Sequence, residues 1–340
     1  MDDSMYILYQ FDENYAPFAA VSMTSLFENN KDIQIVIYAF AENVCEATKK
    51  KLAVLVERYR GKLIFLDTAS LINKMEYLGI PKYRGAYATN FKLFINTVLP
   101  SEITRILYLD CDTLVTDSLK DLFWRDLEGF SLAMALDSLG DKHAKLIGLS
   151  RDSYYVNGGV MLFDLPKWSE KRCAERIAEY AKNVRANFPS PDQDLLNIVL
   201  NGEIYILEPK YNFQPVHKVY SLRLYRFFWR WKRYYDDTTM IESERNIVIH
   251  HCFRYLGQFP WNKNSIHPDV DEFNRYWALS GWSDCLSQSA GNDNEVFKIE
   301  RKLYRVLPAP VFLALFRIFY NCFIWSANRK SLKNQDCKNM

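Results

Sequence analysis

The chain has 340 residues, of which 49% are hydrophobic and 25% are charged. This composition is close to the average of globular proteins and excludes collagen-like, low-complexity and intrinsically disordered chains. The 43 Lys and Arg residues nearly balance the 41 Asp and Glu residues, so the chain lacks the strongly basic composition that usually accompanies nucleic-acid binding, and we expect no nucleic-acid partner.

Apolar runs and amphipathic segments alternate through the first half of the chain. Apolar runs typical of buried strands lie at 5–11, 33–39, 63–66, 105–109, 131–136 and 159–163, and helical spacing covers 16–28 and 44–59. Strands that alternate with helices predict an α/β fold with a mainly parallel sheet and helices on both faces. Because such sheets bind ligands at the carboxyl ends of their strands, polar side chains directly after a strand are candidate site residues.

Beyond residue 220 the sequence becomes basic and aromatic, apart from one more strand predicted at 246–250. We therefore expect an α/β domain over 1–265 and a helical extension over 266–340. The seven cysteines are scattered without a C-x-x-C pair, which favours a reduced, cytoplasmic setting. The acidic N-terminus predicts no signal peptide, and no apolar run reaches the roughly 20 residues that span a bilayer.

Two acidic residues follow the apolar run at 105–109. Asp110 and Asp112 are two positions apart, so in an extended chain they share a face. Their mutual repulsion is costly unless a cation lies beside them, and carboxylate oxygens suit Mn²⁺ or Mg²⁺. The alternative is a strand end with two solvated acids, because D-x-D often occurs by chance.

The segment at 108–123, YLDCDTLVTDSLKDLF, resembles the D-x-D segment of family 8 glycosyltransferases. Further motifs in the same order extend this resemblance over residues 5–262. The family includes bacterial lipopolysaccharide galactosyl- and glucosyltransferases. The resemblance implies a GT-A fold with a Rossmann-like mixed sheet, retaining transfer from a nucleotide sugar, and donor contacts from Asp110 and Cys111.

The N-terminal segment at 9–26 looks like the opening strand and nucleotide loop of the family. The resemblance implies that Asp12 and Asn14 contact the uracil and ribose and that Tyr15 stacks on the base. A loop between a strand and a helix N-terminus is a good nucleotide site. The alternative is that Asp12 and Asn14 only cap the helix that begins near Ala16.

Three more positions match the donor-binding motifs of the family. Lys92, in YATNFKLF, takes the place of an Arg that faces the donor, and the alternative is a solvated lysine on a helix. Asp137 follows the strand at 131–136, where the resemblance implies a contact with a sugar hydroxyl. Asn157, in VNGGVMLFDL, would bind the donor sugar or shape the acceptor pocket. A turn into a buried strand explains its neighbouring glycines equally well.

The segment PDQDLLN at 191–197 opens a predicted helix. The resemblance places Asp192 and Gln193 beside the anomeric carbon. Asp192 would act as a covalent nucleophile, or Gln193 would support a front-face attack in which a UDP oxygen takes the acceptor proton. The alternative is that Asp192 and Asp194 only favour the helix N-terminus.

The segment at 247–261, IVIHHCFRYLGQFPW, resembles the closing motif of the family, and His250 aligns with its metal-binding histidine. The implied ligands are therefore Asp110, Asp112 and His250, which suit Mn²⁺ somewhat better than Mg²⁺. Strand alternation places His250 and His251 on opposite faces. Phe259 departs from the family, which has a diphosphate-binding Lys before Pro-Trp, and Arg254 is a candidate substitute.

Two basic, aromatic segments lie late in the chain. The first, 223–233, interleaves five Arg and Lys residues with five aromatic residues, and the second, 301–330, repeats this composition. A helix at 310–325 is too short to span a bilayer but suits a membrane interface with anionic head groups. The alternative is a helical hairpin packed on the α/β domain.

These features predict a metal-dependent, retaining hexosyltransferase that is cytoplasmic and peripheral to the inner face of the membrane. It would move glucose or galactose from a UDP-sugar to a surface polysaccharide or lipopolysaccharide acceptor, for which a lipid-linked glycan is one candidate. An alternative is a catalytically weakened nucleotide-sugar- or glycan-binding protein on the same fold, which Phe259 and Lys92 favour. A nucleotidyltransferase is a further alternative, although the first strand is not followed by a Gly-rich triphosphate loop.

Overall fold

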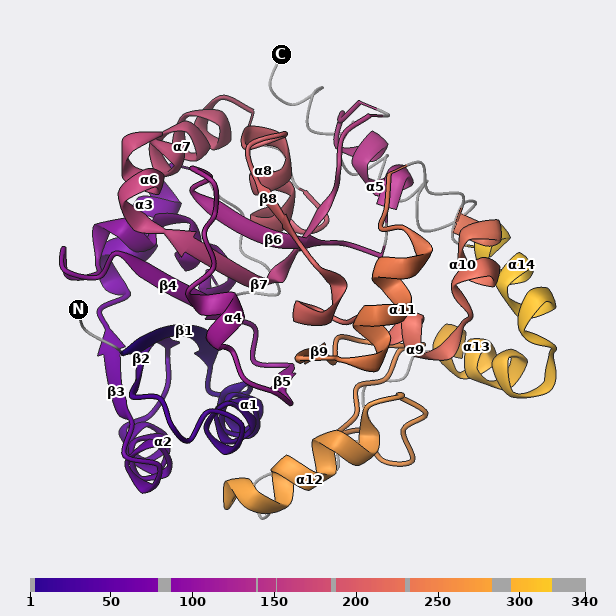
Figure 1. Cartoon of the computed structure of the whole chain (residues 1–340), viewed down its shortest axis with the longest axis horizontal. Coiled ribbons are helices and arrows are strands. Elements are labelled where there is room, and N and C mark those ends of the chain that lie inside the picture. The colour runs from indigo at the N-terminus through magenta and orange to yellow at the C-terminus, as the bar shows by residue number, and fades with distance from the viewer. Residues whose placement is uncertain are drawn as a thin grey trace.

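The computed structural model describes residues 4–78, 87–138, 140–150, 152–184, 188–229, 233–282 and 295–319. Seven of its strands are β1 (Met5–Asp12), β2 (Ile35–Glu42), β3 (Lys62–Leu66), β4 (Arg105–Leu109), β6 (Leu132–Leu136), β7 (Val156–Asp164) and β8 (Tyr205–Leu207). They form one sheet in the order β3-β2-β1-β4-β7-β6-β8 (Figure 1). The predicted α/β fold is confirmed, and the six apolar runs of the first half each lie on one of these strands.

The sheet is mixed because β7 runs against its neighbours. The pairs β3–β2, β2–β1, β1–β4 and β6–β8 are parallel, whereas β7 is antiparallel to both β4 and β6. Leu109, the last residue of β4, pairs with Val160. The beginning of β7 therefore lies beside the carboxyl end of β4, where ligands bind in sheets of this kind.

Helices cover both faces of the sheet (Figure 1). One face packs against α1 (Ala16–Glu28), α2 (Glu46–Arg58) and the short α4 (Lys120–Phe123). The other face packs against α3 (Ala69–Leu78), the 3₁₀ helix η1 (Ala88–Thr97), α6 (Leu165–Glu170), α7 (Cys173–Val184) and α8 (Pro191–Val199). Small side chains such as Ala19 and Ala20 let α1 pack closely on the sheet, and this helix is buried nearly all round.

A second, two-stranded sheet pairs distant parts of the sequence. It consists of β5 (Thr113–Val115), which follows β4 after a short loop, and β9 (Ile249–His251), which corresponds to the strand predicted at 246–250. The two strands are antiparallel. The segments between β6 and β9 contain α5 (Gly140–Leu146), the 3₁₀ helix η2 (Pro209–Tyr211), α9 (Pro215–Val219), α10 (Leu222–Trp229) and α11 (Asp237–Arg245).

The helices after residue 265 pack in two different places. α12 (Val270–Ser280) lies along α1, and the Asn29 side-chain amide donates to the Tyr276 hydroxyl at 2.8 Å. The hairpin of α13 (Glu295–Val306) and α14 (Ala309–Phe319) packs on α10, with Phe312 and Leu313 buried beside Tyr225. The inner face of this hairpin is therefore packed against the rest of the protein, as the alternative of a packed helical hairpin predicts.

Part of the predicted basic, aromatic surface lies outside the described residues, namely Arg230, Trp231, Lys232, Arg329 and Lys330. Among the helices that the structure does describe, none combines the length and the apolar character needed to cross a bilayer.

Gly61 allows the chain to pass closely over the core as it leaves α2 for β3. A Cβ atom at this position would lie 2.5 Å from Cζ of Phe27 and 2.9 Å from Cγ1 of Val56. We predict that Gly61→Ala lowers the free energy of unfolding by about 1–3 kcal/mol, because overpacking forces buried side chains to shift. Phe27→Leu removes the atom in closest contact, so the double variant should lose less stability than the sum of the single variants in denaturant unfolding. Strict additivity would contradict this explanation.

Candidate active site

The loop between β4 and β5 is held by backbone hydrogen bonds on both sides. The Asp110 amide donates to the Gly159 carbonyl at 2.8 Å, and the Cys252 amide donates to the Asp112 carbonyl at 2.7 Å. Thr113 pairs with His251 in the β5–β9 ladder. These contacts bring the D-x-D loop, the beginning of β7 and the end of β9 together.

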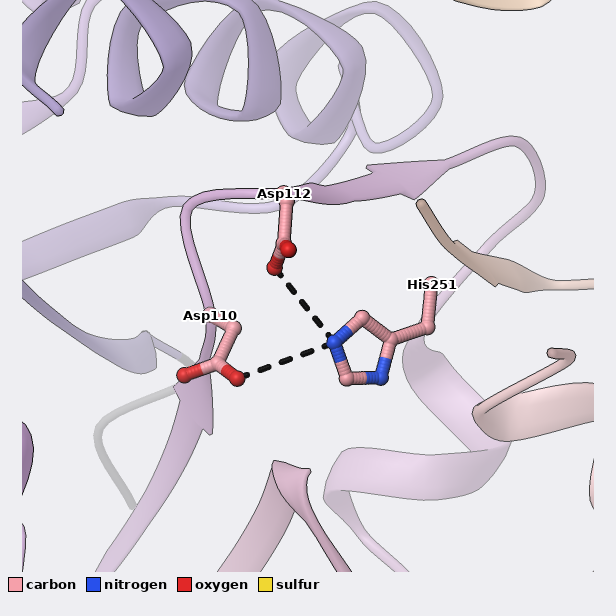
Figure 2. A group of neighbouring side chains, drawn as sticks. All are labelled: Asp110, Asp112 and His251. Carbon is pink, nitrogen blue, oxygen red and sulfur yellow. Dashed lines mark ion pairs between the residues drawn. The ribbon is translucent and has the colours of Figure 1, made fainter. Parts of the chain in front are cut away.

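Asp110, Asp112 and His251 converge on one point (Figure 2). Nε2 of His251 lies 3.4 Å from Oδ1 of Asp112 and 3.7 Å from Oδ2 of Asp110. Ligand atoms about 2.1 Å from one ion can lie up to roughly 4.2 Å apart, so both distances fit a shared divalent cation. Two carboxylate oxygens and one imidazole nitrogen are a donor set suited to Mn²⁺ or Mg²⁺.

The prediction of His250 as the metal ligand is wrong. His250 points away from the D-x-D loop, and its Nδ1 lies 2.7 Å from Oδ1 of the buried Asp269, which also pairs with Lys218. Its neighbour His251 takes the place beside the aspartates. The physical reason is the two-residue periodicity of β9, which sends consecutive side chains to opposite faces.

The charges at this site are mutually dependent. Burial and the neighbouring Asp112 raise the pKa of Asp110, although Lys92 and His251 oppose this effect. Burial lowers the pKa of His251, but Asp112 and Asp110 raise it more, and the net pKa is above the ordinary value. A divalent cation would relieve the repulsion between the carboxylates, so the residues fit such an ion.

Lys92 is a buried member of the site rather than a solvated lysine. Its side chain is 2% exposed, and its Nζ lies 2.8 Å from Oδ2 of Asp192 and 3.8 Å from Oδ1 of Asp110. It also donates to the Gly158 carbonyl at 3.0 Å. Burial alone would lower the pKa of Lys92, but the two carboxylates raise it above the ordinary value. Lys92 is therefore a fixed positive charge between Asp110 and Asp192.

Asp137, Asn157 and Gln193, which come from three separate sequence motifs, meet in one buried hydrogen-bond network. Oδ2 of Asp137 accepts from the Asn157 amide at 2.8 Å and from the Gln193 amide at 3.0 Å. Oε1 of Gln193 accepts from the Gly158 backbone amide at 2.8 Å. The Gln193 side chain is thus bonded at both ends.

The expected nucleotide loop lies directly before α1, whose N-cap residue is Tyr15. Oδ1 of Asp12 accepts from the backbone amide of Tyr15 at 3.0 Å, just before α1. Asn14 is exposed, and the ring of Tyr15 is edge-on to Phe18. Cys111 is buried, and its thiol donates to the Gln10 carbonyl at 3.4 Å. Among the described residues, no side-chain cap hydrogen bond is present at the start of α1, so the structure does not support the capping alternative for Asp12.

Sequence reasoning did not predict the buried contacts of several polar residues. Asp194 accepts from the Tyr155 hydroxyl at 2.7 Å and lies 2.8 Å from Nε2 of His143. Asn212 lies 2.9 Å from Nδ1 of His251. The tandem histidines were a visible signal for His251, whereas no spacing or motif marks Asn212 or His143.

Comparisons with known proteins agree with this geometry. Residues 6–265 match the model of Glycosyl transferase family 8. General stress protein A of Bacillus subtilis is 26% identical over 292 residues, or 83% of this chain and 96% of that protein. Lipopolysaccharide 1,2-glucosyltransferase of Escherichia coli K12 is 25% identical over 288 residues, or 83% of this chain and 80% of that protein.

The fold is also similar to solved structures. A galactosyltransferase crystallised with donor and acceptor sugar analogues superimposes with a TM-score of 0.65 at 22% identity, over 82% of this chain and 99% of that chain. This similarity supports the GT-A type of the α/β fold.

Because Gly159 has no side chain, the His251 ring fits against its backbone. A substitution at Gly159 therefore tests the proposed metal site. A Cβ at Gly159 would lie 2.1 Å from Cε1 of His251, whereas a Cβ at Gly158 would meet nothing closer than 3.6 Å. We predict that Gly159→Ala weakens Mn²⁺ binding, measured by titration calorimetry, by roughly 10- to 100-fold because the imidazole must move. Gly158→Ala is the matched control and should bind Mn²⁺ as the wild type does. Equal affinities in the two variants would contradict the assigned site.

Proposed function

The chain belongs to glycosyltransferase family 8, and from this premise we propose that it transfers a hexose, glucose or galactose, from a UDP-sugar with retention of anomeric configuration. The proposed acceptor is a surface polysaccharide or lipopolysaccharide, for which a lipid-linked glycan is one form. The observation that carries the proposal is the convergence of Asp110, Asp112 and His251 at the carboxyl edge of the sheet.

Asp110, Asp112 and His251 would hold Mn²⁺, with Mg²⁺ as the alternative ion. When bound, such an ion supplies Lewis-acid stabilisation of the charge on a departing diphosphate. The neighbouring protein groups contribute orientation, because the Tyr108 hydroxyl donates to Asp110 and the backbone of Gly159 holds the Asp110 amide. Fixed dipoles and charges of this kind act without reorganising during the reaction.

Asp192 is the proposed residue at the anomeric carbon. Its carboxylate is held by the Nζ of Lys92 at 2.8 Å and remains 14% exposed. An ionised carboxylate there can attack the carbon covalently or stabilise the positive charge that develops during front-face attack. Gln193 is bonded to Gly158, Asp137 and Tyr155, so we assign it to shaping this wall rather than to attack.

The other proposed donor-binding residues are assigned from their places around the cluster of Asp110, Asp112 and His251. We propose that Asp137 and Asn157, whose side chains are joined at 2.8 Å, bind sugar hydroxyls. We assign Asp12, Asn14, Tyr15 and Cys111 to the nucleotide. Lys92 supplies positive charge at the donor in place of the arginine expected there.

A catalytically weakened binding protein is the second candidate because Phe259 replaces a cationic residue. Phe259 stacks on Trp261 with ring centroids 4.5 Å apart. The guanidinium of Arg254 lies 5.4 Å from the centre of the Phe259 ring. We propose that Arg254 supplies the missing positive charge, which favours the active enzyme over the weakened one.

The outer face of the C-terminal hairpin supports a peripheral membrane location at the inner face of the membrane. The helices α10, α13 and α14 carry both exposed apolar and exposed basic side chains. The apolar ones are Phe227, Val296, Ile299, Val306, Val311, Leu315 and Ile318, and the basic ones are Arg223, Lys302, Arg305 and Lys298, of which Lys298 is ion-paired with Glu295. Basic side chains with apolar neighbours match an anionic lipid surface. We therefore propose that this face contacts the membrane from which a lipid-linked acceptor extends.

We predict UDP release from UDP-glucose or UDP-galactose in the presence of Mn²⁺, and loss of that release with a chelator. Replacing His251 by Ala should lower the rate by roughly 10²-fold or more, because one ligand of the charge-stabilising ion is removed. His250→Asn is the matched control, since His250 faces Asp269 instead. The assay measures UDP release in each variant.

Two results would contradict the proposed function. The first is the absence of UDP release and of UDP-sugar binding by the wild type under all conditions. The second is stronger thermal stabilisation by nucleoside triphosphates than by UDP, which would favour a nucleotidyltransferase.

We also predict that the protein sediments with anionic vesicles of phosphatidylglycerol but not with phosphatidylcholine vesicles. Lys302→Glu combined with Arg305→Glu should reduce binding by roughly tenfold or more, because each basic residue near an anionic surface contributes about 1 kcal/mol. Lys50→Glu, an exposed change on α2, is the control and should bind nearly as the wild type does. Equal sedimentation with both lipids, or equal binding by all variants, would contradict the proposed membrane face.

A further inference from the structure

Asn212 lies where the metal site meets the buried polar network. It follows η2, and its neighbour Phe213 exchanges backbone hydrogen bonds with β9, donating to Ile249 at 2.8 Å and accepting from His251 at 3.0 Å. The Asn212 side chain is 2% exposed, and its Oδ1 lies 2.9 Å from Nδ1 of His251. Its position relative to the imidazole is therefore fixed by the backbone.

The orientation of the Asn212 amide follows from its neighbour Asn157. Oδ1 of Asn157 accepts from the Gly159 backbone amide at 3.0 Å, and its Nδ2 donates to the Asp137 carboxylate at 2.8 Å. A backbone amide only donates and a carboxylate only accepts, so the Asn157 amide has one satisfactory orientation. Its oxygen is consequently the atom that faces Asn212.

The same reasoning extends to the imidazole. Nδ2 of Asn212 donates to Oδ1 of Asn157 at 2.8 Å, which leaves Oδ1 of Asn212 facing His251. An oxygen acceptor requires a proton on Nδ1 of His251. In the neutral imidazole the lone pair is then on Nε2, the nitrogen that faces Asp110 and Asp112.

We propose that Asn212 is a positioning residue that holds His251 in the Nδ1–H tautomer and so directs the Nε2 lone pair at the cation. Metal-binding histidines generally donate their second N–H to a fixed partner, and loss of that partner weakens metal affinity. The backbone amide of Gly159 fixes the orientation of Asn157, which in turn fixes that of Asn212. The absence of a side chain at Gly159 also makes room for the His251 ring. The inference rests on the proposed metal site.

The test compares variants of Asn212 by two measurements that do not require sugar transfer. Nitrogen-15 NMR at alkaline pH, where the imidazole is neutral, reports which ring nitrogen carries the proton, and His251→Gln assigns the signal among the five histidines. Mn²⁺ affinity is measured by titration calorimetry. We expect the proton on Nδ1 in the wild type and in Asn212→Asp, whose carboxylate still accepts.

Asn212→Leu should lose the fixed tautomer and bind Mn²⁺ roughly 10- to 100-fold more weakly. Asn30→Leu is the matched control, because Asn30 is equally buried but bonds to the backbone of Leu26 and Leu119 instead of the site. It should lose stability without losing Mn²⁺ affinity.

A proton on Nε2 in the neutral wild type would overturn the inference, and so would wild-type Mn²⁺ affinity in Asn212→Leu. An equal loss of affinity in Asn30→Leu would also overturn it, because the effect would then be one of general stability. If Asn212→Leu changes both the tautomer and the affinity while the wild type releases no UDP, the inference stands and the proposed function alone fails.

Discussion

The repulsion between carboxylates at one edge of the sheet is the constraint on which the rest of the site depends. Asp110 and Asp112 are close because the chain between β4 and β5 is short and tied at both ends, and Asp192 approaches from α8. The protein supplies two balancing groups, the buried Lys92 and the imidazole of His251. A divalent ion would complete this balance, which explains why so much charge can be kept in a largely buried place.

The reversed direction of β7 makes this assembly possible. In a wholly parallel sheet the strand beside β4 would bring its own carboxyl end to this edge. Because β7 is antiparallel, it brings its beginning instead, where Asn157, Gly158 and Gly159 lie. Their backbone groups bond to Asp110, Lys92 and Gln193, and the missing side chain of Gly159 makes room for His251. One short segment therefore organises the cluster of Asp110, Asp112 and His251, the buried lysine and the hydrogen-bonded side-chain amides together.

Much of the fold was predictable because it follows from local patterns. The apolar runs mark the strands, and Asp110 and Asp112 are visible as acids after a strand. The choice between His250 and His251 was not predictable in this way, since it depends on the register of β9 against β5, more than a hundred residues earlier. The family resemblance marked Lys92 as a donor-facing position, but its burial was not predictable, because its ion-pair and hydrogen-bond partners come from β4, β7 and α8 and not from its own segment. Asn212 makes its contacts through tertiary structure alone, so its sequence context carries no sign of them.

The pairing of β5 with β9 also bears on how the protein matures during synthesis. Folding can begin during synthesis, which proceeds from the N-terminus. The strands from β1 to β8 end at Leu207, so the central sheet can assemble before His251 has been translated. A nascent chain of that length holds the acidic loop without its imidazole, and His251 joins Asp110 and Asp112 only when β9 emerges and pairs with β5. The group of Asp110, Asp112 and His251 is thereby assembled only at a late stage of translation, after the sheet that positions its two aspartates.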